Sequence, residues 1–245
     1  ANWKGDWITD TYDFNIKPAP YFRKEFHLQK KIKSARAYIA VAGLYELFLN
    51  GEKVGNHRLD PAYTRFDRRT LYVTYDVTHH LKEGNNAIGV SLGNGWYNHQ
   101  STAVWYFDKA PWRARPKFCM DMRITYEDGT EEIVCTRQDW KTSLSPVIFN
   151  SIYTAEHYDA RLEPEGWNKP GFDDSKWRNS LNTGAPSQNI TAQMLHPIRN
   201  VEKLPVKELF EFSNRNYVFD FGRNISGVSQ IKVTGQAGTK IHMIH

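Results

Sequence analysis

The chain has 245 residues, of which 40% are hydrophobic and 24% charged, so it can form a packed core and wholesale disorder is excluded. The net charge is +5, but the basic residues are scattered, the densest group (Arg65, Arg68 and Arg69) is short, and no nucleic-acid-binding signature occurs, which argues against a nucleic-acid partner. No apolar run approaches the roughly 20 residues that span a bilayer, so we expect no membrane partner.

The first predicted elements are β-strands. They cover residues 21–26, 35–42 and 45–49, where β-branched and aromatic residues alternate loosely with polar ones. The third strand runs directly into Asn50-Gly51. This dipeptide predicts a two-residue hairpin loop, because both loop positions need a positive φ and Asn and Gly tolerate it.

Further strands are predicted at 71–75, 87–92 and 118–126, followed by a hairpin partner at 131–136. Taking Asp128-Gly129 as a two-residue loop places Met122 opposite Cys135. Cys119 then lies on the other face of the sheet from Cys135, and a disulfide between them would need large distortion. We therefore expect two free thiols, and the spacing of the cysteines gives them no role in metal binding.

Helical periodicity is weak throughout, with short turns expected near 76–81 and 173–177. Short, regularly spaced strands with turn residues between them predict an all-β fold, an antiparallel jelly-roll (galactose-binding-like) sandwich. A Ser/Asn/Gly/Pro-rich stretch at 179–188 is typical of a linker or a long loop. We expect one domain over residues 1–195. Residues 196–245 should begin a second β-sandwich domain that is cut short, with strands at 217–221, 228–234 and 240–244.

Several runs of sequence resemble the N-terminal region of bacterial α-L-rhamnosidases (glycoside hydrolase family 78). They are Gly-Leu-Tyr-Glu-Leu-Phe-Leu-Asn-Gly (43–51), Leu-Asp-Pro-Ala-Tyr-Thr-Arg-Phe-Asp (59–67), Gly-Asn-Gly-Trp-Tyr (93–97), Tyr-Asp-Ala-Arg-Leu-Glu-Pro-Glu-Gly-Trp (158–167) and Val-Phe-Asp-Phe-Gly-Arg-Asn-Ile-Ser-Gly (218–227). The Asn-Gly element also occurs in the sugar-binding domains of β-galactosidase-like hydrolases, which are the alternative family. The ordered combination with the two later runs is more specific.

The resemblance implies a parent protein that hydrolyses terminal α-L-rhamnosides with inversion, in a separate α/α-barrel downstream of this region. No stretch here is similar to that barrel's Asp-x-Arg-x-Glu-Arg-Leu-Gly-Trp motif, so we expect the chain itself to be non-catalytic. The adjacent Asp173 and Asp174 are assigned to turns and caps.

The partners implied by the resemblance are a rhamnose-containing glycan, as substrate of the parent, and the catalytic barrel of the same polypeptide. No cofactor is expected. Some related carbohydrate-binding modules hold a structural Ca²⁺, but the sequence assigns no residues to one. We expect a periplasmic or extracellular location in a bacterium. The chain opens at Ala1 without a signal peptide, which indicates a processed or longer natural chain.

The candidate binding residues gather in the loop after the strand at 87–92. They are Trp96, Tyr97, Asn98, Trp105, Asp108, Trp112 and Arg113. Glycans are bound by such mixtures of stacking rings and polar groups, but the same rings can also pack under a loop or against a neighbouring domain. The region is therefore either a carbohydrate-binding module or a structural scaffold. Rhamnose-binding relatives use an Asp-Asn pair before a Tyr-Gly turn, whereas here Asp108 precedes Lys109, so we favour the scaffold.

Overall fold

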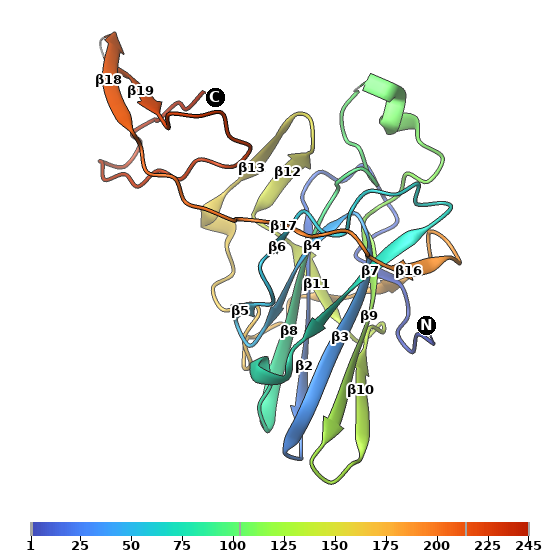
Figure 1. The fold of residues 1–245 in the computed structure, drawn as a ribbon. Coiled ribbons are helices and arrows are strands. Elements are labelled where there is room, and N and C mark those ends of the chain that lie inside the picture. The colour runs from blue at the N-terminus through green and yellow to red at the C-terminus, as the bar shows by residue number, and fades with distance from the viewer. Residues whose placement is uncertain (1, 103, 214, 245) are drawn as a thin grey trace. The chain divides into compact units, whose positions relative to one another are not determined.

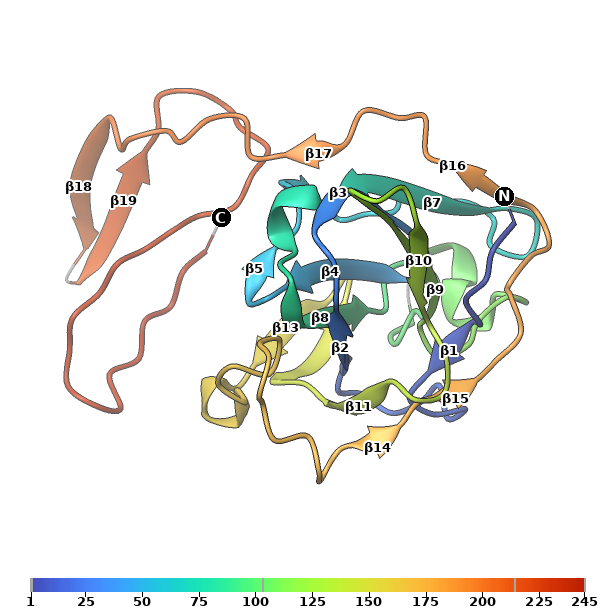
Figure 2. The same cartoon turned by 90° about the horizontal axis from the view of Figure 1, so that it is seen from below.

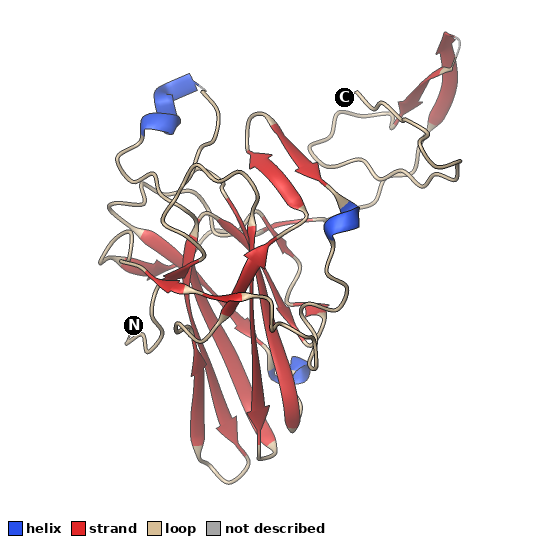
Figure 3. Cartoon of the chain, turned by 180° about the vertical axis from the view of Figure 1, so that it is seen from behind, coloured by secondary structure: helices blue, strands red, loops and turns tan. Residues whose placement is uncertain are grey.

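The computed structural model describes residues 2–102, 104–213 and 215–244 of the chain. Nearly all of its regular structure is β-strand, and the helical segments are short 3₁₀ turns (Figure 3). Within the described residues, no helix is long and apolar enough to cross a membrane. The chain divides into two compact units, Ala1–Arg199 and Asn200–His245. The all-β fold class predicted from the sequence is confirmed.

The first unit contains a seven-stranded sheet centred on two long neighbouring strands (Figure 1). In spatial order the strands are β15 (Leu181–Asn182), β1 (Ile8–Thr9), β9 (Lys117–Tyr126), β3 (Ile32–Ala42), β7 (Thr70–Asp76) and β16 (Ile190–Ala192), and β10 (Glu131–Cys135) also pairs with β9. The pairings are antiparallel except that of β16 with β7, which is parallel. The first strand is held by a strand from near the end of the unit, because Ile8 lies opposite Asn182.

A six-stranded antiparallel sheet forms the second layer of the unit. Its strands, in spatial order, are β14 (Arg178–Asn179), β11 (Lys141–Leu144), β2 (Pro20–Leu28), β8 (Gly84–Gly93), β4 (Leu44–Leu49) and β5 (Glu52–Lys53). Figure 2 views the strands from below, with β7 and β11 on opposite sides of the sandwich. Two layers that are antiparallel except for the β7–β16 pair agree with the predicted sandwich, while the jelly-roll connectivity stays a prediction.

Three short strand pairs and three 3₁₀ turns complete the described elements. The pairs are β12 (Val147–Ser151) with β13 (Ala155–Tyr158), β6 (His57–Arg58) with β17 (Ile198–Arg199) and, in the second unit, β18 (Glu208–Ser213) with β19 (Asn216–Asp220). The 3₁₀ turns are η1 (Thr78–His80), η2 (Val104–Lys109) and η3 (Ala160–Leu162). The helical turn predicted near 76–81 is present as η1, whereas at 173–177 the chain makes a single hydrogen-bonded turn.

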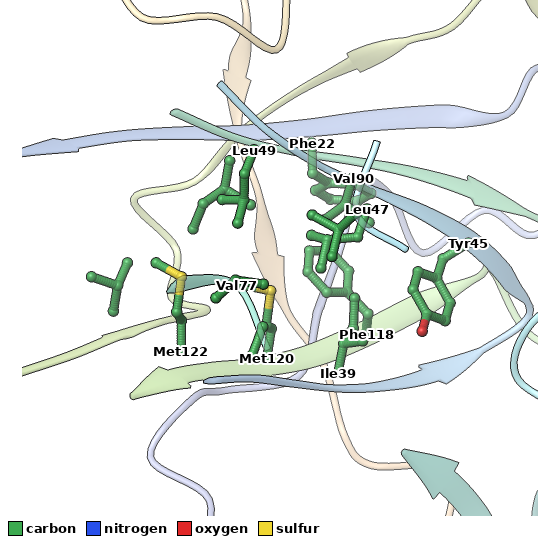
Figure 4. Packing of buried hydrophobic residues seen from close by; sticks show 14 of the residues in the cluster. Phe22, Ile39, Tyr45, Leu47, Leu49, Val77, Val90, Phe118, Met120 and Met122 are labelled. Carbon is green, nitrogen blue, oxygen red and sulfur yellow. The ribbon is translucent and has the colours of Figure 1, made fainter. Parts of the chain in front are cut away.

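The main hydrophobic core lies between the two sheets, where side chains of both layers meet (Figure 4). Phe22, Leu47 and Val90 come from the six-stranded sheet, and Ile39 and Met120 come from the seven-stranded one. Every second residue of β9 from 118 to 124 belongs to this core, which is the alternation that the sequence predicted. Each such side chain contributes about 1.5–3 kcal/mol when fully buried.

The amino-terminal segment covers the outer face of β9. Asp121 is buried on that face and accepts hydrogen bonds from Lys4 N at 3.0 Å and Gly5 N at 2.8 Å. Trp7 and Cys119 belong to a second apolar cluster there. Both faces of the central strand are therefore buried, although its sequence alternates as if one face met solvent.

Residues 159–177 cover the outer face of the six-stranded sheet in the same way. The Trp167 ring stacks on Tyr21 with centroids 4.0 Å apart, and the Trp167 carbonyl accepts a hydrogen bond from Nε of the buried Arg23 at 2.8 Å. Arg23 also forms an ion pair with Asp174. Asp173 accepts the Ser175 N–H at 3.0 Å and so stabilises a turn, as predicted, but Asp174 instead neutralises a buried guanidinium.

The two predicted hairpins have different outcomes. Asn50 and Gly51 have φ of 53° and 91°, and Leu49 pairs with Glu52, so the two-residue loop is confirmed. The loop between β9 and β10 has three residues instead of two, because Tyr126 N donates to Thr130 O at 2.9 Å across it. This is the type I turn with a bulged glycine that commonly closes three-residue hairpins.

The longer loop shifts the register of β10 against β9 by one residue, and this changes the sheet face on which Cys135 lies. Met122 lies opposite Val134, and Cys135 lies opposite Asp121. Cys119 and Cys135 therefore share a sheet face, so the expectation that they lie on opposite faces is wrong. Both are free and buried, and burial raises the pKa of the Cys119 thiol to about 12.

Two expectations about the end of the chain also need correction. The stretch 179–188 is not a bare linker, because it carries β15, which joins the seven-stranded sheet, and the end of β14, which joins the other sheet. In the second unit the strand predicted at 217–221 is present as β19, but 228–234 and 240–244 form no strand. A strand needs a neighbour to satisfy its backbone groups, and the described part of this unit contains only one hairpin.

Candidate binding face at the loop end of the sandwich

The candidate loop begins with a tight turn directly after β8. The Asn94 carbonyl accepts hydrogen bonds from Tyr97 N at 3.2 Å and Asn98 N at 3.1 Å. Gly95 has a φ of 49° and lies against Leu44, a place where a larger residue would be strained and crowded. The turn sends the Tyr97 and Asn98 side chains into the protein, where both are buried.

Asn98 uses its side-chain amide to join three segments. Its Nδ2 donates to the Phe14 carbonyl at 2.9 Å and to Asn94 Oδ1 at 3.1 Å. Its Oδ1 accepts from Arg113 Nε at 3.1 Å. Because both donor hydrogens and the carbonyl oxygen are engaged, Asn98 is a structural hub of the loop and presents no free group to a ligand.

Arg113 closes the same loop from its other end. Its NH1 donates to the Asp108 carbonyl at 3.0 Å, and its guanidinium lies over the Phe14 ring, 4.8 Å from the centroid. These contacts tie η2 and the amino-terminal segment together. The guanidinium is thus committed to the protein, as the Asn98 amide is.

A group of contacting aromatic rings, here called the aromatic rim, lies above this polar layer. Trp96 is at its centre, with ring centroids 5.0 Å from Phe107, 5.3 Å from Tyr153 and 5.9 Å from Tyr63. Trp105 joins it through Phe107 at 6.2 Å. In Figure 1 the segment of η2 and the β12–β13 hairpin, which supply three of these rings, extend at the same end of the sheets, away from the β9–β10 hairpin tip.

Trp105 is the most exposed ring of the aromatic rim, at 73% relative exposure. Trp105 and Tyr106 have φ of 68° and 54°, a left-handed backbone that ordinary residues adopt at a cost of roughly 1–3 kcal/mol. This conformation breaks η2 and leaves both side chains exposed. Lys109 Nζ lies over the Tyr106 ring, 5.4 Å from its centroid.

Three buried polar atoms near the rim have no hydrogen-bond partner among the described residues: His99 Nδ1, Asp108 Oδ1 and Asn150 Nδ2. Burial lowers the pKa of His99, the Arg113 charge lowers it further, and the Asp108 carboxylate opposes the shift. The imidazole is therefore predominantly neutral at pH 7. A hydroxyl group or water could satisfy such atoms, which are expensive to leave unpaired.

The carboxylate of Glu163 has structural partners. Glu163 accepts hydrogen bonds from the hydroxyls of Tyr158 at 2.7 Å and Tyr21 at 3.3 Å. Among the described residues, no group of three or more His, Cys, Asp or Glu side chains is placed to hold a metal ion.

The structure brings the predicted loop residues together but gives them different surroundings. Tyr97 and Asn98 are buried, and Arg113 and Trp112 are half-buried but hydrogen-bonded within the protein, Arg113 to Asn98 at 3.1 Å and Trp112 Nε1 to the Trp96 carbonyl at 3.4 Å. The Trp105 ring is exposed, and Asp108 Oδ1 is buried without a hydrogen-bond partner among the described residues.

Sequence reasoning missed rim residues that come from elsewhere in the chain. Tyr63 lies in the run 59–67 that had carried the family resemblance, and Tyr153 lies in the β12–β13 hairpin, where no strand was predicted. Tyr63 had a sequence signal of its own, since it is an aromatic residue in a Pro-flanked loop, whereas nothing in the sequence links Tyr153 to Trp96.

Two packed and mainly antiparallel sheets with an aromatic loop end place the chain among the β-sandwich domains. Comparison with known proteins narrows this class. The family described as "Alpha-L-rhamnosidase N-terminal domain" matches residues 30–202, and the "Bacterial alpha-L-rhamnosidase concanavalin-like domain" matches residues 210–245. The chain therefore belongs to the α-L-rhamnosidase N-terminal domain family.

Relatives and solved structures agree with this assignment. An α-L-rhamnosidase of Formosa agariphila is 37% identical over 230 residues, which cover 92% of this chain and 24% of the relative. The structure of α-L-rhamnosidase from Dictyoglumus thermophilum matches with a TM-score of 0.79 and 38% identity, over 90% of this chain and 26% of the other. The Streptomyces avermitilis α-L-rhamnosidase, solved in complex with L-rhamnose, matches with a TM-score of 0.77 and 34% identity, over 85% and 20%.

The chain spans about a quarter of the length of the curated relatives that it matches. The matched family is the one that the sequence motifs indicated, and it displaces the β-galactosidase-like alternative.

Proposed function

We propose that this chain is the non-catalytic amino-terminal region of an α-L-rhamnosidase and that its sandwich is a scaffold for the hydrolytic domain of the same polypeptide. Family membership and the quarter-length match to whole α-L-rhamnosidases support this. The parent protein would release terminal α-L-rhamnosyl groups from a glycan, with inversion, in the separate α/α-barrel that the family resemblance implies.

The observation that carries the scaffold role is the engagement of the loop side chains inside the protein. Asn98, Arg113 and Trp112 make their hydrogen bonds to neighbouring segments and not into an open site. The rings left exposed at this end are those of Trp105 and Tyr106 in the loop and those of Tyr63 and Tyr153, which contact Trp96. Exposed aromatic rings are typical of the central contacts of a protein interface. The aromatic rim is the face that we assign to the hydrolytic domain.

The whole parent protein is expected to release nitrophenol from 4-nitrophenyl α-L-rhamnoside, and the 245-residue chain at the same molar concentration should release none above background. The reason is that the catalytic carboxylates lie in the other domain. Steady release by the purified chain would contradict the non-catalytic assignment. Release from a β-D-galactoside by the parent, without rhamnosidase activity, would contradict the assignment of the parent.

A second candidate function, sugar binding, is favoured by two polar atoms without a partner among the described residues. One is Oδ1 of Asp108, which follows the exposed Trp105 in η2, and the other is Nδ1 of His99, whose ring stacks on Trp96 at 6.2 Å. A ring for stacking together with unpaired polar atoms suits a monosaccharide with neighbouring hydroxyls. A single sugar in such a site would bind with a Kd near 1 mM, which corresponds to roughly 4 kcal/mol.

Replacing Trp105 with alanine separates these two roles. The exposed ring adds little to folding, so Trp105→Ala should change the free energy of unfolding by less than about 0.5 kcal/mol. Trp96→Ala removes the centre of the rim and should cost about 3 kcal/mol or more. Calorimetric titration of the chain with L-rhamnose at tens of millimolar should show no heat of binding if the rim is a docking face. Saturable binding that Trp105→Ala abolishes would instead establish the sugar-binding role.

A further inference from the structure

A buried carboxylate joins the sandwich to the segment that leads into the second unit. Asp60 is 4% exposed, and its backbone is fixed because the Tyr45 N–H donates to the Asp60 carbonyl at 3.1 Å. Asp60 Oδ2 lies 2.5 Å from His57 Nδ1 and 3.5 Å from the Tyr75 hydroxyl. Burial raises the pKa of Tyr75 to about 12, so this hydroxyl is a donor at neutral pH.

The other oxygen of Asp60 holds the connector, defined here as residues 190–199. Gln193 Nε2 donates to Asp60 Oδ1 at 3.0 Å, and Gln193 Oε1 accepts the Ala62 N–H at 2.8 Å. The Gln193 backbone N–H donates to the Tyr72 carbonyl at 2.9 Å. One glutamine thus binds the connector to the loop of Asp60 and to β7 at the same time.

Apart from Ile190, which packs partly buried against the second apolar cluster, apolar burial contributes little to holding the rest of the connector. Every residue of 190–199 is exposed or half-buried, and Met194 is 89% exposed. Its other ties are backbone pairs, the parallel pairing of β16 with β7 and the two-residue pairing of β17 with β6. The β6 strand begins at His57, the residue that contacts Asp60, so the same network supports both ends of the connector.

The loop that carries Asp60 is held in an unusual backbone conformation. Leu59 has a φ of 54°, which a leucine adopts only when its surroundings impose it. The hydrogen bonds around Asp60 supply that constraint. The carboxylate is therefore positioned before the connector binds to it, which lowers the entropic cost of the Gln193 contact.

We propose that Asp60 and Gln193 form a latch that fixes the connector on the sandwich, and that the latch can open, releasing the edge strand β16, without unfolding the rest of the two sheets. Opening would free residues 190–199, from which the chain passes into the second unit at Asn200. The latch thus holds the last ten residues of the first unit on its own sheets. It is a conformational role separate from the aromatic rim.

The test replaces the amide of Gln193 with a carboxylate. Gln193→Glu keeps the acceptor for Ala62 N–H but turns the donor that faces Asp60 Oδ1 into a like charge. Hydrogen exchange of the 245-residue chain, measured by mass spectrometry, should become about ten- to a hundredfold faster at the amides of 190–199 and stay unchanged in β3 and β9. Gln100→Glu is the matched control, because Gln100 also hydrogen-bonds through both side-chain atoms, to Phe14 and Lys17, away from the connector.

A second substitution, at residue 60, restores a hydrogen-bond donor between the two side chains. Asp60→Asn combined with Gln193→Glu supplies an amide for the new carboxylate, and connector exchange should return to within about threefold of the unchanged chain. Unchanged exchange in Gln193→Glu, no recovery in the double variant, or equal acceleration in β3 and β9 would each overturn the latch. The last result would mean that the network is part of the general stability of the sandwich.

Discussion

Replacing Arg115 with methionine is expected to lower the free energy of unfolding by about 3–5 kcal/mol. Arg115 and Asp10 form a bidentate ion pair with N–O distances of 2.8 and 2.9 Å, and their side chains are 2% and 1% exposed. The guanidinium also donates to the carbonyls of Ile16 at 2.9 Å and Pro18 at 2.7 Å. Methionine would leave a buried carboxylate and two carbonyls without these partners. Urea denaturation followed by tryptophan fluorescence measures the loss.

An exposed pair in the same protein is the matched control. Arg161 and Asp159 are also bidentate, at 2.8 and 2.6 Å, but the Arg161 side chain is 88% exposed. Arg161→Met should therefore cost less than about 1 kcal/mol. Removing both buried charges, with Asp10→Asn in the Arg115→Met chain, should recover part of the loss. If Arg115→Met and Arg161→Met lowered the free energy of unfolding equally, burial would not determine how much an ion pair contributes to stability.

Trp167→Ala is expected to destabilise the sandwich by about 3–5 kcal/mol and to loosen residues 159–177. The ring is buried against Tyr21 at 4.0 Å and Phe48 at 5.7 Å, and the Trp167 carbonyl accepts from Arg23. Without the ring, the segment loses its main apolar contact with the six-stranded sheet. The buried Arg23 side chain beside it then becomes more exposed to solvent. Denaturation should report the loss of stability, and limited proteolysis should cut within 159–177 before any other site in the first unit.

A glycine under the same ring tests the closeness of this packing. A Cβ added at Gly89 would lie 2.8 Å from the Trp167 ring and 2.7 Å from Asn168 Cβ, whereas one at Gly184 would meet nothing within 4 Å. Gly89→Ala should thus cost about 1–3 kcal/mol, and Gly184→Ala should have an effect near zero. If Gly89→Ala and Trp167→Ala both leave the segment resistant to protease, the segment is held by something other than this contact.

The strands of the sandwich could be predicted because their alternation follows directly from burial of the core. The register of β10 could not, since Glu-Asp-Gly fits a two-residue loop and a three-residue loop equally well. The neighbouring Ile133 and Val134 are both apolar, so hydrophobicity alone does not decide which of them faces inwards. The backbone hydrogen bond between Tyr126 and Thr130 makes that choice.

The candidate site could be located only in part by sequence. The run from Trp96 to Arg113 concentrates aromatic and amide groups, and this composition alone indicates a binding or docking loop. Which of these groups face outwards depends on the Asn94 turn and on Asn98, whose partners lie 84 and 15 residues away along the chain, at Phe14 and Arg113. Such long-range contacts leave no periodic signal, so the engagement of Asn98 and the exposure of Trp105 follow only from the fold.

The pairing of β1 with β15 constrains how the protein folds as it is made. Ile8 leaves the ribosome long before the strand that completes its sheet, which ends at Asn182, and before the connector strand β17, which ends at Arg199. Contacts between residues so far apart in sequence form slowly, because a long loop must close before they stabilise anything. The sandwich therefore cannot be completed during synthesis of its first half. The edge of β1 that faces β15 must remain unpaired until Asn182 has been translated, which is a long interval in which chaperones can bind it.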